Sequence, residues 1–300
     1  MTDRGVEEQP SETAFFAALR RAIAHKEYQN DRFGPDYLAE TFLPPHFRFF
    51  LKFKSIRENT KTKLNEALPG LTEYMIARTA YFDQLFAEAL SNGTPQIVLL
   101  GAGYDSRAYR YSAINRGTTI FELDIKPTQN RKKDCLAKAR IDIPTQIKFV
   151  PINFREESIL EVLKKGGFNP QEKTLFLWEG VSYYLNAESV GETLAVASQA
   201  AHQKTSIAFD YTISVPEGKQ DEYFGVREFS QTMKEHHEAE ELLFSMEEGK
   251  TESFLEGRGL KIVDHLDNKE IEHRFLLDDK GDLVGQITGH FRFVLAVKDI

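Results

Sequence analysis

The sequence predicts an α/β protein built on a doubly wound, mostly parallel β-sheet, and three observations lead to this fold class. From residue 95 onwards, short β-rich runs alternate with segments of helical pattern. Several of these runs are continuously apolar, as expected for strands that are covered on both faces. Two further runs close the chain and are expected to form an antiparallel pair at the sheet edge. The predicted strands span residues 96–101, 118–124, 147–153, 174–180, 205–212, 259–266 and 290–298.

Helical patterns dominate the chain before the first predicted strand. Residues 1–12 are polar and acidic and are expected to form a disordered tail. Residues 13–92 are predicted to form an N-terminal helical cap, whose last helix ends at Ser91-Asn92-Gly93. Residues 93–300 are predicted to form the core, interrupted by a helical insertion at about 213–258.

One segment of the cap, FLPPHFRFFLKFKSIREN (42–59), mixes aromatic and basic residues. Such a mixture is compatible with a helix that lies on a membrane surface. A helix that packs its rings on the domain is the favoured interpretation, and a lid over a pocket is one form of it. The rings in question are Phe47, Phe49, Phe50 and Phe53.

Composition narrows the class of protein. The 300 residues carry a net charge of −8, which argues against a general nucleic-acid binder. The single cysteine, Cys135, allows no disulfide within the chain and is expected to be a buried structural thiol on a helix. We see no secretory signal and no apolar window near the roughly 18 residues of a membrane span. A cytoplasmic location without a membrane partner is therefore expected.

Glycine and acidic residues mark the carboxyl ends of the predicted strands, where sheets of this type bind ligands. Gly101-Ala102-Gly103 follows the first strand, and glycine lets the backbone turn tightly beside a ligand. Asp124 ends the second strand, where a carboxylate can accept hydrogen bonds from ribose hydroxyls. Asn153 ends the third strand, where its amide is placed to meet a base.

These marks do not complete a dinucleotide fingerprint. That motif is Gly-x-Gly-x-x-Gly, and its last glycine is replaced here by Ser106. No Gly-Lys-Ser/Thr follows either, so the loop is not a Walker motif. A nicotinamide oxidoreductase stays open as an alternative, but the strand pattern with its closing antiparallel pair favours a methyl-donor site.

Four segments resemble the leucine carboxyl methyltransferase-like family, including its bacterial branch of S-adenosylmethionine-dependent O-methyltransferases. They are ARTAYFDQ (77–84), VLLGAGYDSRAYR (98–110), FELDIKPTQNRKK (121–133) and LFLWEGVSYYL (175–185). The Gly-x-Gly-x-Asp-Ser-Arg run in the second is the most specific. Residues 17–43 are similar to the family's N-terminal helix and turn, with Gly-Pro-Asp-Tyr in an altered order. The resemblance covers most of residues 14–212.

This resemblance implies a class I methyltransferase fold, a Rossmann-like seven-stranded sheet, with S-adenosylmethionine as cofactor. It implies that Arg78 holds the methionine carboxylate, which a guanidinium can grip with two hydrogen bonds. Gly101, Ala102 and Gly103 would line the methionine part of the donor. Asp124 would hold the ribose.

The resemblance also implies roles at the next strand ends. Glu179 would sit near the amino group of the donor, and a carboxylate there is costly to bury unpaired. Asn153 stands where the family often has an aspartate, and it keeps one carbonyl acceptor for the adenine amino group. Phe154 would pack on the adenine.

The acceptor is expected to be a small molecule or a carboxyl group, methylated on oxygen. Tyr183, Tyr184, Asp210 and Tyr211 lie at or after strand ends, and the first three are our candidates for the acceptor side. A binding module without catalysis stays open as an alternative. No metal site is expected, because the KEHHEAEE segment (234–241) places two adjacent histidines about 100° apart on a helix.

Overall fold

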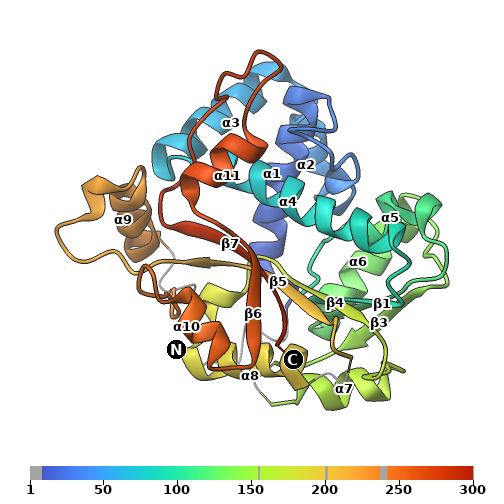
Figure 1. The fold of residues 1–300 in the computed structure, drawn as a ribbon. Helices are drawn as coiled ribbons and strands as arrows, with labels where there is room; N and C mark the ends of the chain where they lie inside the picture. Colours follow the sequence, from blue (N-terminus) through green and yellow to red (C-terminus); the bar gives the residue numbers. More distant parts are fainter. Residues whose placement is uncertain (1–8, 155, 200–201, 237–241, 300) are drawn as a thin grey trace.

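A central seven-stranded β-sheet organises the molecule (Figure 1). The structure is a computed structural model that describes residues 9–154, 156–199, 202–236 and 242–299. The strands lie in the order β3-β2-β1-β4-β5-β7-β6. β7 is antiparallel to both of its neighbours, and the remaining strand pairs are parallel. The strands are β1 (Gln96–Leu100), β2 (Thr119–Asp124), β3 (Ile147–Pro151), β4 (Thr174–Trp178), β5 (Ser206–Thr212), β6 (Leu260–Leu266) and β7 (Phe291–Lys298).

This sheet confirms the predicted fold class, including the antiparallel pair at its edge. Each predicted strand boundary lies within two residues of the observed one. The largest differences fall at the ends of β3 and β4, which stop at Pro151 and Trp178. Asn153 and Glu179 therefore lie in the loops just beyond their strands, on the side where parallel sheets bind ligands.

Helices cover both faces of the sheet. Ile97 and Leu99 of β1 belong to a hydrophobic cluster shared with α1, α4 and α11, whereas Val98 and Leu100 face a second cluster with α7, α8 and α10. Figure 1 shows α4 and α11 on one side of the sheet and α7, α8 and α10 on the other. The helices are α1 (Glu12–Tyr28), α2 (Pro45–Phe50), α3 (Lys54–Ala67), α4 (Leu71–Ser91), α5 (Arg107–Arg110), α6 (Lys126–Lys138), α7 (Ile159–Lys165), α8 (Ala187–Gln199), α9 (Val226–His236), α10 (Thr251–Glu256) and α11 (Asn268–Phe275).

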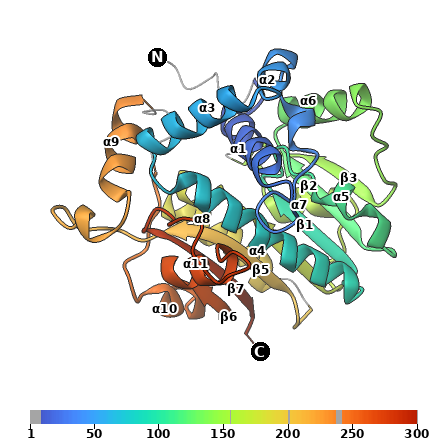
Figure 2. The same ribbon diagram turned by 90° about the horizontal axis from the view of Figure 1, so that it is seen from above.

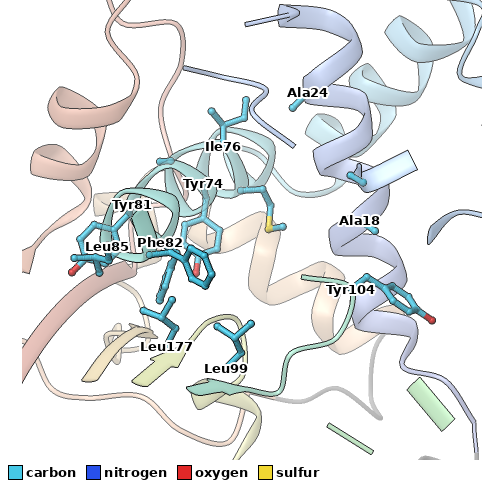
Figure 3. Close-up of a cluster of buried hydrophobic side chains, with 14 of the residues drawn as sticks. Ala18, Ala24, Tyr74, Ile76, Tyr81, Phe82, Leu85, Leu99, Tyr104 and Leu177 are labelled. Carbon is cyan, nitrogen blue, oxygen red and sulfur yellow. The ribbon is translucent and has the colours of Figure 1, made fainter. Parts of the chain in front are cut away.

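The long helix α4 is fixed against the sheet by its apolar face. Figure 3 shows Phe82 and Leu85 of α4 facing Leu99 and Leu177 of β1 and β4. Phe82 is completely buried, and burial of a large apolar side chain contributes about 1.5–3 kcal/mol of stability. This packing sets the position of the polar residues that α4 carries towards the strand ends.

The N-terminal elements group together along one side of α4 (Figure 2). α1 begins at Glu12, and the Ser11 hydroxyl caps it by accepting a hydrogen bond from the Ala14 amide. The predicted tail of residues 1–12 is therefore too long at its end, and residues 1–8 lie outside the described part. The cap and the sheet share one hydrophobic cluster, and the proposed boundary at residue 93 stays a prediction.

The aromatic segment differs from our expectation. Phe47 packs on Phe15 of α1, with ring centroids 5.1 Å apart. The rings of Phe49, Phe50 and Phe53 instead remain 54%, 47% and 47% exposed. The prediction that this segment packs its rings on the domain is therefore wrong for three of the four rings, because Leu51, directly after α2, enters the core instead of them.

The predicted insertion is only partly helical. α9 and α10 lie within residues 213–258, but Met246 forms a parallel bridge with Ile213 beside the end of β5. α9 ends at His236, and residues 237–241, including the second predicted histidine, lie outside the described residues.

Two smaller expectations have mixed outcomes. Cys135 lies on α6 as predicted but is half-buried rather than buried, and burial raises the pKa of its thiol. Among the residues that the structure describes, no helix is long and apolar enough to cross a membrane. The cytoplasmic location stays a prediction.

Candidate donor-binding site

The loop after β1 makes a tight turn that depends on its two glycines. Gly101 and Gly103 have φ values of +69° and +44°, a backbone region that residues with a Cβ rarely adopt. A Cβ on Gly101 would lie 2.8 Å from Val181, and one on Gly103 would lie 3.1 Å from Ala14 of α1. Buried Ala102 between them donates its amide to the Leu123 carbonyl of β2 at 2.8 Å. The loop thus holds its backbone close to both the sheet and the N-terminal helix.

Asp124 at the end of β2 is tied to this loop. Its Oδ2 accepts a hydrogen bond from the Gly103 amide at 2.6 Å, and its Oδ1 accepts one from the Ile125 amide at 2.8 Å. Burial raises the pKa of the carboxyl, while these two amides oppose the rise. The Thr128 side chain donates a third hydrogen bond to the carboxylate. One of its roughly four acceptor positions therefore remains for a hydroxyl.

Arg78 of α4 reaches over the ends of β4 and β5. Its Nε donates to Glu179 Oε1 at 3.0 Å, and its Nη1 donates to the Tyr183 hydroxyl at 3.1 Å and to Asp210 Oδ2 at 3.4 Å. Burial lowers the pKa of the guanidinium, but its acidic and phenolic neighbours raise it well above the ordinary value. The side chain is thus a permanently charged, buried cation.

Glycine at position 180 makes room for this cation. Gly180 has a φ of +72°, and a Cβ there would lie 2.8 Å from Arg78 Nη1. The preceding residue, Glu179, is left in contact with two arginines, because its Oε2 lies 2.7 Å from Arg107 Nη1. The turn after β4 therefore places a carboxylate and a guanidinium side by side next to the glycine loop.

Asp210 and Tyr183 surround Arg78 instead of facing an open space. Asp210 is fully buried on β5, where its Oδ1 accepts the Gly180 amide at 2.6 Å and its Oδ2 accepts the Tyr74 hydroxyl. Burial raises the pKa of the Asp210 carboxyl. Tyr183 is buried beside it, and the half-buried ring of Tyr184 lies edge-on against Tyr183 at 4.8 Å. Of the three predicted acceptor-side residues, only Tyr184 is partly accessible.

The predicted base-binding residues follow β3. The Ile152 amide donates to the Asp124 carbonyl at 3.1 Å, so the end of β3 lies next to Asp124, the residue expected to hold the ribose. Asn153 and Phe154 are both half-buried just beyond it, and Phe154 packs on the second hydrophobic cluster. The structure thus places the glycine loop, Asp124 and Asn153 along one edge of the sheet.

Sequence reasoning did not assign Tyr74, Asp83 or Arg107 to this site. Tyr74 lies one helical turn before Arg78, and that i, i+4 spacing was the available signal for a shared face. Asp83 and Arg107 were visible only as parts of matched segments. Their contacts connect α4, the glycine loop and the β4 turn, which no local pattern encodes.

These residues fit the amino-acid part of S-adenosylmethionine, because a zwitterion needs one cationic and one anionic partner. Solved structures share the fold. A "putative methyltransferase" from Thermobifida fusca superposes with a TM-score of 0.60 at 12% identity, covering 98% of this chain and 96% of that one. A DUF574 family protein from Streptomyces avermitilis also gives 0.60 at 12% identity, covering 98% and 99%. The fold is that of class I methyltransferases.

The family follows from the sequence comparisons. The leucine carboxyl methyltransferase model matches residues 14–198, more than half of the chain. The Bacillus subtilis protein named "Putative S-adenosyl-L-methionine-dependent methyltransferase YktD" is 30% identical over 301 residues, covering 94% of this chain and 97% of that protein. A relative of similar name from Mycobacterium sp. (strain JLS) is 28% identical, covering 82% of each. The chain belongs to the leucine carboxyl methyltransferase family and is an S-adenosylmethionine-dependent methyltransferase.

Proposed function

We propose that this enzyme methylates an oxygen atom of a small molecule or carboxyl-bearing acceptor. The main observation that supports donor binding is the Arg78–Glu179 ion pair beside the glycine loop, in which Arg78 Nε lies 3.0 Å from Glu179 Oε1. Arg78 binds the carboxylate of the donor and Glu179 its ammonium group. Asp124 holds the ribose by accepting one hydroxyl, and Gly101-Ala102-Gly103 lines the methionine part. Asn153 and Phe154 contact the adenine from the end of β3.

S-adenosylmethionine supplies a methyl group that is already activated by its bond to a sulfonium. The protein therefore contributes mainly alignment of the reactants and exclusion of water. Arg78 and Glu179 fix one end of the donor from α4 and the β4 turn, and Asp124 fixes the other. Because both fixed points lie on packed elements, the methyl group is held at a constant place relative to the acceptor.

A carboxylate acceptor fits the site better than a hydroxyl acceptor, because the described part of the site lacks a well-placed general base. A hydroxyl needs a base to remove its proton, whereas a carboxylate is already ionised at neutral pH. Asp210 is poorly suited to be that base, since it is fully buried and already accepts hydrogen bonds from Gly180 and Tyr74. The Tyr183 hydroxyl accepts a hydrogen bond from Arg78 Nη1, which leaves Tyr184 to contact the acceptor. The name of the family model, leucine carboxyl methyltransferase, supports the same choice.

The test combines binding with turnover. Calorimetric titration with S-adenosylmethionine and with S-adenosylhomocysteine should give a one-to-one complex. A panel of hydrophobic carboxylic acids, phenols and alcohols is then incubated with methyl-labelled donor, and methyl esters are recognised because mild base releases their label as methanol. Label that is stable to mild base would contradict carboxylate methylation and indicate a hydroxyl acceptor. Donor binding without transfer to any acceptor would favour the non-catalytic binding module.

The nicotinamide alternative has a direct control in the same experiment. Nicotinamide dinucleotides added to the titration should produce no heat and should not compete with S-adenosylhomocysteine. Competition by them would revive the oxidoreductase interpretation.

A further inference from the structure

The Asp105-Ser106-Arg107 triplet has no part in the donor contacts proposed above, although it is the most specific mark of the family in the sequence. The structure buries Arg107 to 3% exposure at the first turn of α5. Its Nη1 donates to Asp105 Oδ2 at 2.6 Å and its Nε donates to Asp83 Oδ1 at 2.7 Å. Nη1 also lies 2.7 Å from Glu179 Oε2. One guanidinium therefore joins the glycine loop, α4 and the β4 turn.

Asp83 holds this guanidinium from a fixed position. Arg110 grips the same carboxylate with two hydrogen bonds of 2.7 Å, one to each oxygen. The side chain of Asp83 is 6% exposed and lies on α4, five residues beyond Arg78. Paired, planar contacts of this kind fix both distance and orientation. Arg107 is thus held by a carboxylate that is itself immobilised.

Arg107 and Asp105 stabilise each other's charges. Burial lowers the pKa of the Arg107 guanidinium, but Asp105, Glu179 and Asp83 together raise it well above its ordinary value. Burial would raise the pKa of Asp105, and Arg107 with its neighbours holds it below the ordinary value. A buried charge is costly unless it is paired and hydrogen-bonded. Arg107 and Asp105 therefore help each other to remain ionised.

We infer that Arg107, held by Asp83 and Asp105, is a positioning residue that aims Glu179 at the amino group of the donor. The inference rests on the proposed donor site and assigns a role to the triplet within it. Arg107 occupies Oε2 of Glu179, while Oε1 accepts a single hydrogen bond from Arg78 Nε and keeps a second acceptor position for the donor ammonium.

Competition between two arginines explains why such a holder is needed. Glu179 is in a loop, and its nearest other cation is Arg78. Without Arg107, the carboxylate is free to turn and make a two-bond pair with Arg78, which is the preferred geometry of these groups. That pair would occupy both groups that must receive the zwitterion. By retaining one oxygen of Glu179, Arg107 keeps the Arg78 guanidinium available for the carboxylate of the donor.

The test compares two ligands that differ only in the amino-acid part. S-adenosylhomocysteine carries it, and 5′-methylthioadenosine has the same adenosine and thioether without it. Arg107→Lys keeps the charge but removes the planar fork. We expect its affinity for S-adenosylhomocysteine to fall by about tenfold or more, the order expected for losing one charged hydrogen bond. Its affinity for 5′-methylthioadenosine should stay within about twofold of the wild type.

Matched variants make the comparison decisive. Glu179→Gln should give the same split between the two ligands. Asp105→Asn, which keeps size and shape, provides a second route if Arg107→Lys does not fold. Arg227→Lys alters an exposed arginine paired with Asp221 and should change neither affinity.

The outcomes separate the inference from the donor site on which it rests. Equal weakening of both ligands by Arg107→Lys and by Asp105→Asn would make the triplet merely structural and overturn the inference. Unchanged binding of both ligands would overturn it as well, provided that Glu179→Gln shows the split. If the wild-type enzyme binds S-adenosylhomocysteine no more tightly than 5′-methylthioadenosine, the assignment of Arg78 and Glu179 fails first.

Discussion

Replacing Asp124 by asparagine should lower donor affinity by about 10- to 150-fold while leaving the fold intact. Oδ2 and Oδ1 each accept one backbone amide, at 2.6 and 2.8 Å, and Thr128 donates a third hydrogen bond, so one acceptor position remains for a ribose hydroxyl. An asparagine amide presents one oxygen and one NH₂ group. Whichever way the amide turns, its NH₂ faces a backbone N–H, so one of these hydrogen bonds is lost in the free and the bound protein alike.

Only the lost ribose contact changes the binding free energy. The NH₂ group cannot accept a hydroxyl hydrogen bond, and the amide oxygen carries no negative charge, so the hydrogen bond to the ribose is lost or loses its charged acceptor. A hydrogen bond to a charged group contributes about 1.5–3 kcal/mol, which corresponds to a loss of about 10- to 150-fold in affinity. The dissociation constant of S-adenosylhomocysteine, measured by calorimetry, checks this value. Circular dichroism and thermal unfolding confirm that the variant is folded.

The control for this prediction is a ligand that lacks one ribose hydroxyl. A 2′-deoxy analogue of the ligand should lose affinity for the wild type but little for Asp124→Asn, since the contact is already weakened there. An affinity of Asp124→Asn within about twofold of the wild type, in a folded variant, would refute the reasoning that Asp124 holds the ribose.

Four further predictions follow from the same geometry. Arg78→Lys should lower the affinity for S-adenosylhomocysteine by about tenfold and leave the affinity for 5′-methylthioadenosine unchanged, because an ammonium cannot span Glu179 and Asp210 as the guanidinium does. Competition calorimetry measures both affinities. Gly180→Ala should lower donor affinity and cost about 1–3 kcal/mol of stability in denaturant titration, because φ is +72° and the Cβ meets Arg78. Donor affinity should fall on acidification before an ordinary aspartate would protonate, since burial raises the pKa of Asp124 and the ionised form binds ribose; Asp124→Asn should flatten the pH profile. Phe49→Ser combined with Phe53→Ser should change the free energy of unfolding by less than about 0.5 kcal/mol per site, as both rings are about half exposed.

The sheet could be predicted because its strands are buried on both faces. The runs QIVLL and TLFLW of β1 and β4 are buried at every position, and such runs are recognisable without knowing their neighbours. The end of β2 could be located for the same reason, which placed Asp124 correctly beside the glycine loop. These features depend on local sequence and on one general rule about where parallel sheets bind ligands.

The surroundings of Arg78 could not be predicted in this way. Asp210 and Tyr183 follow strand-end patterns that resemble those of substrate-facing residues, yet α4 crosses above them and brings Arg78 and Tyr74 into contact with both. The position of α4 is set by long-range packing on the sheet, which local patterns do not contain. The exposed rings of Phe49 and Phe53 show the opposite error, because amphipathic composition does not reveal that Leu51 enters the core in place of these rings.

Ser106 shows why the incomplete fingerprint was informative. In a dinucleotide-binding loop the third glycine allows the helix to pack closely on the strand, so that the N-terminus of the helix faces the pyrophosphate. Here the Ser106 hydroxyl donates to Asp36 of the N-terminal region at 2.6 Å and accepts from Arg110 Nε at 2.8 Å. Asp36 in turn accepts from Arg21 of α1 at 2.8 Å, and the same arginine donates to the Tyr104 carbonyl of the loop. A glycine at this position would remove the Ser106–Asp36 hydrogen bond between the loop and the N-terminal region, and the Arg21–Tyr104 contact would remain. Because S-adenosylmethionine has no pyrophosphate, the position is free to carry a side chain, and that side chain connects the N-terminal helix to the Asp83–Arg107 group behind Glu179.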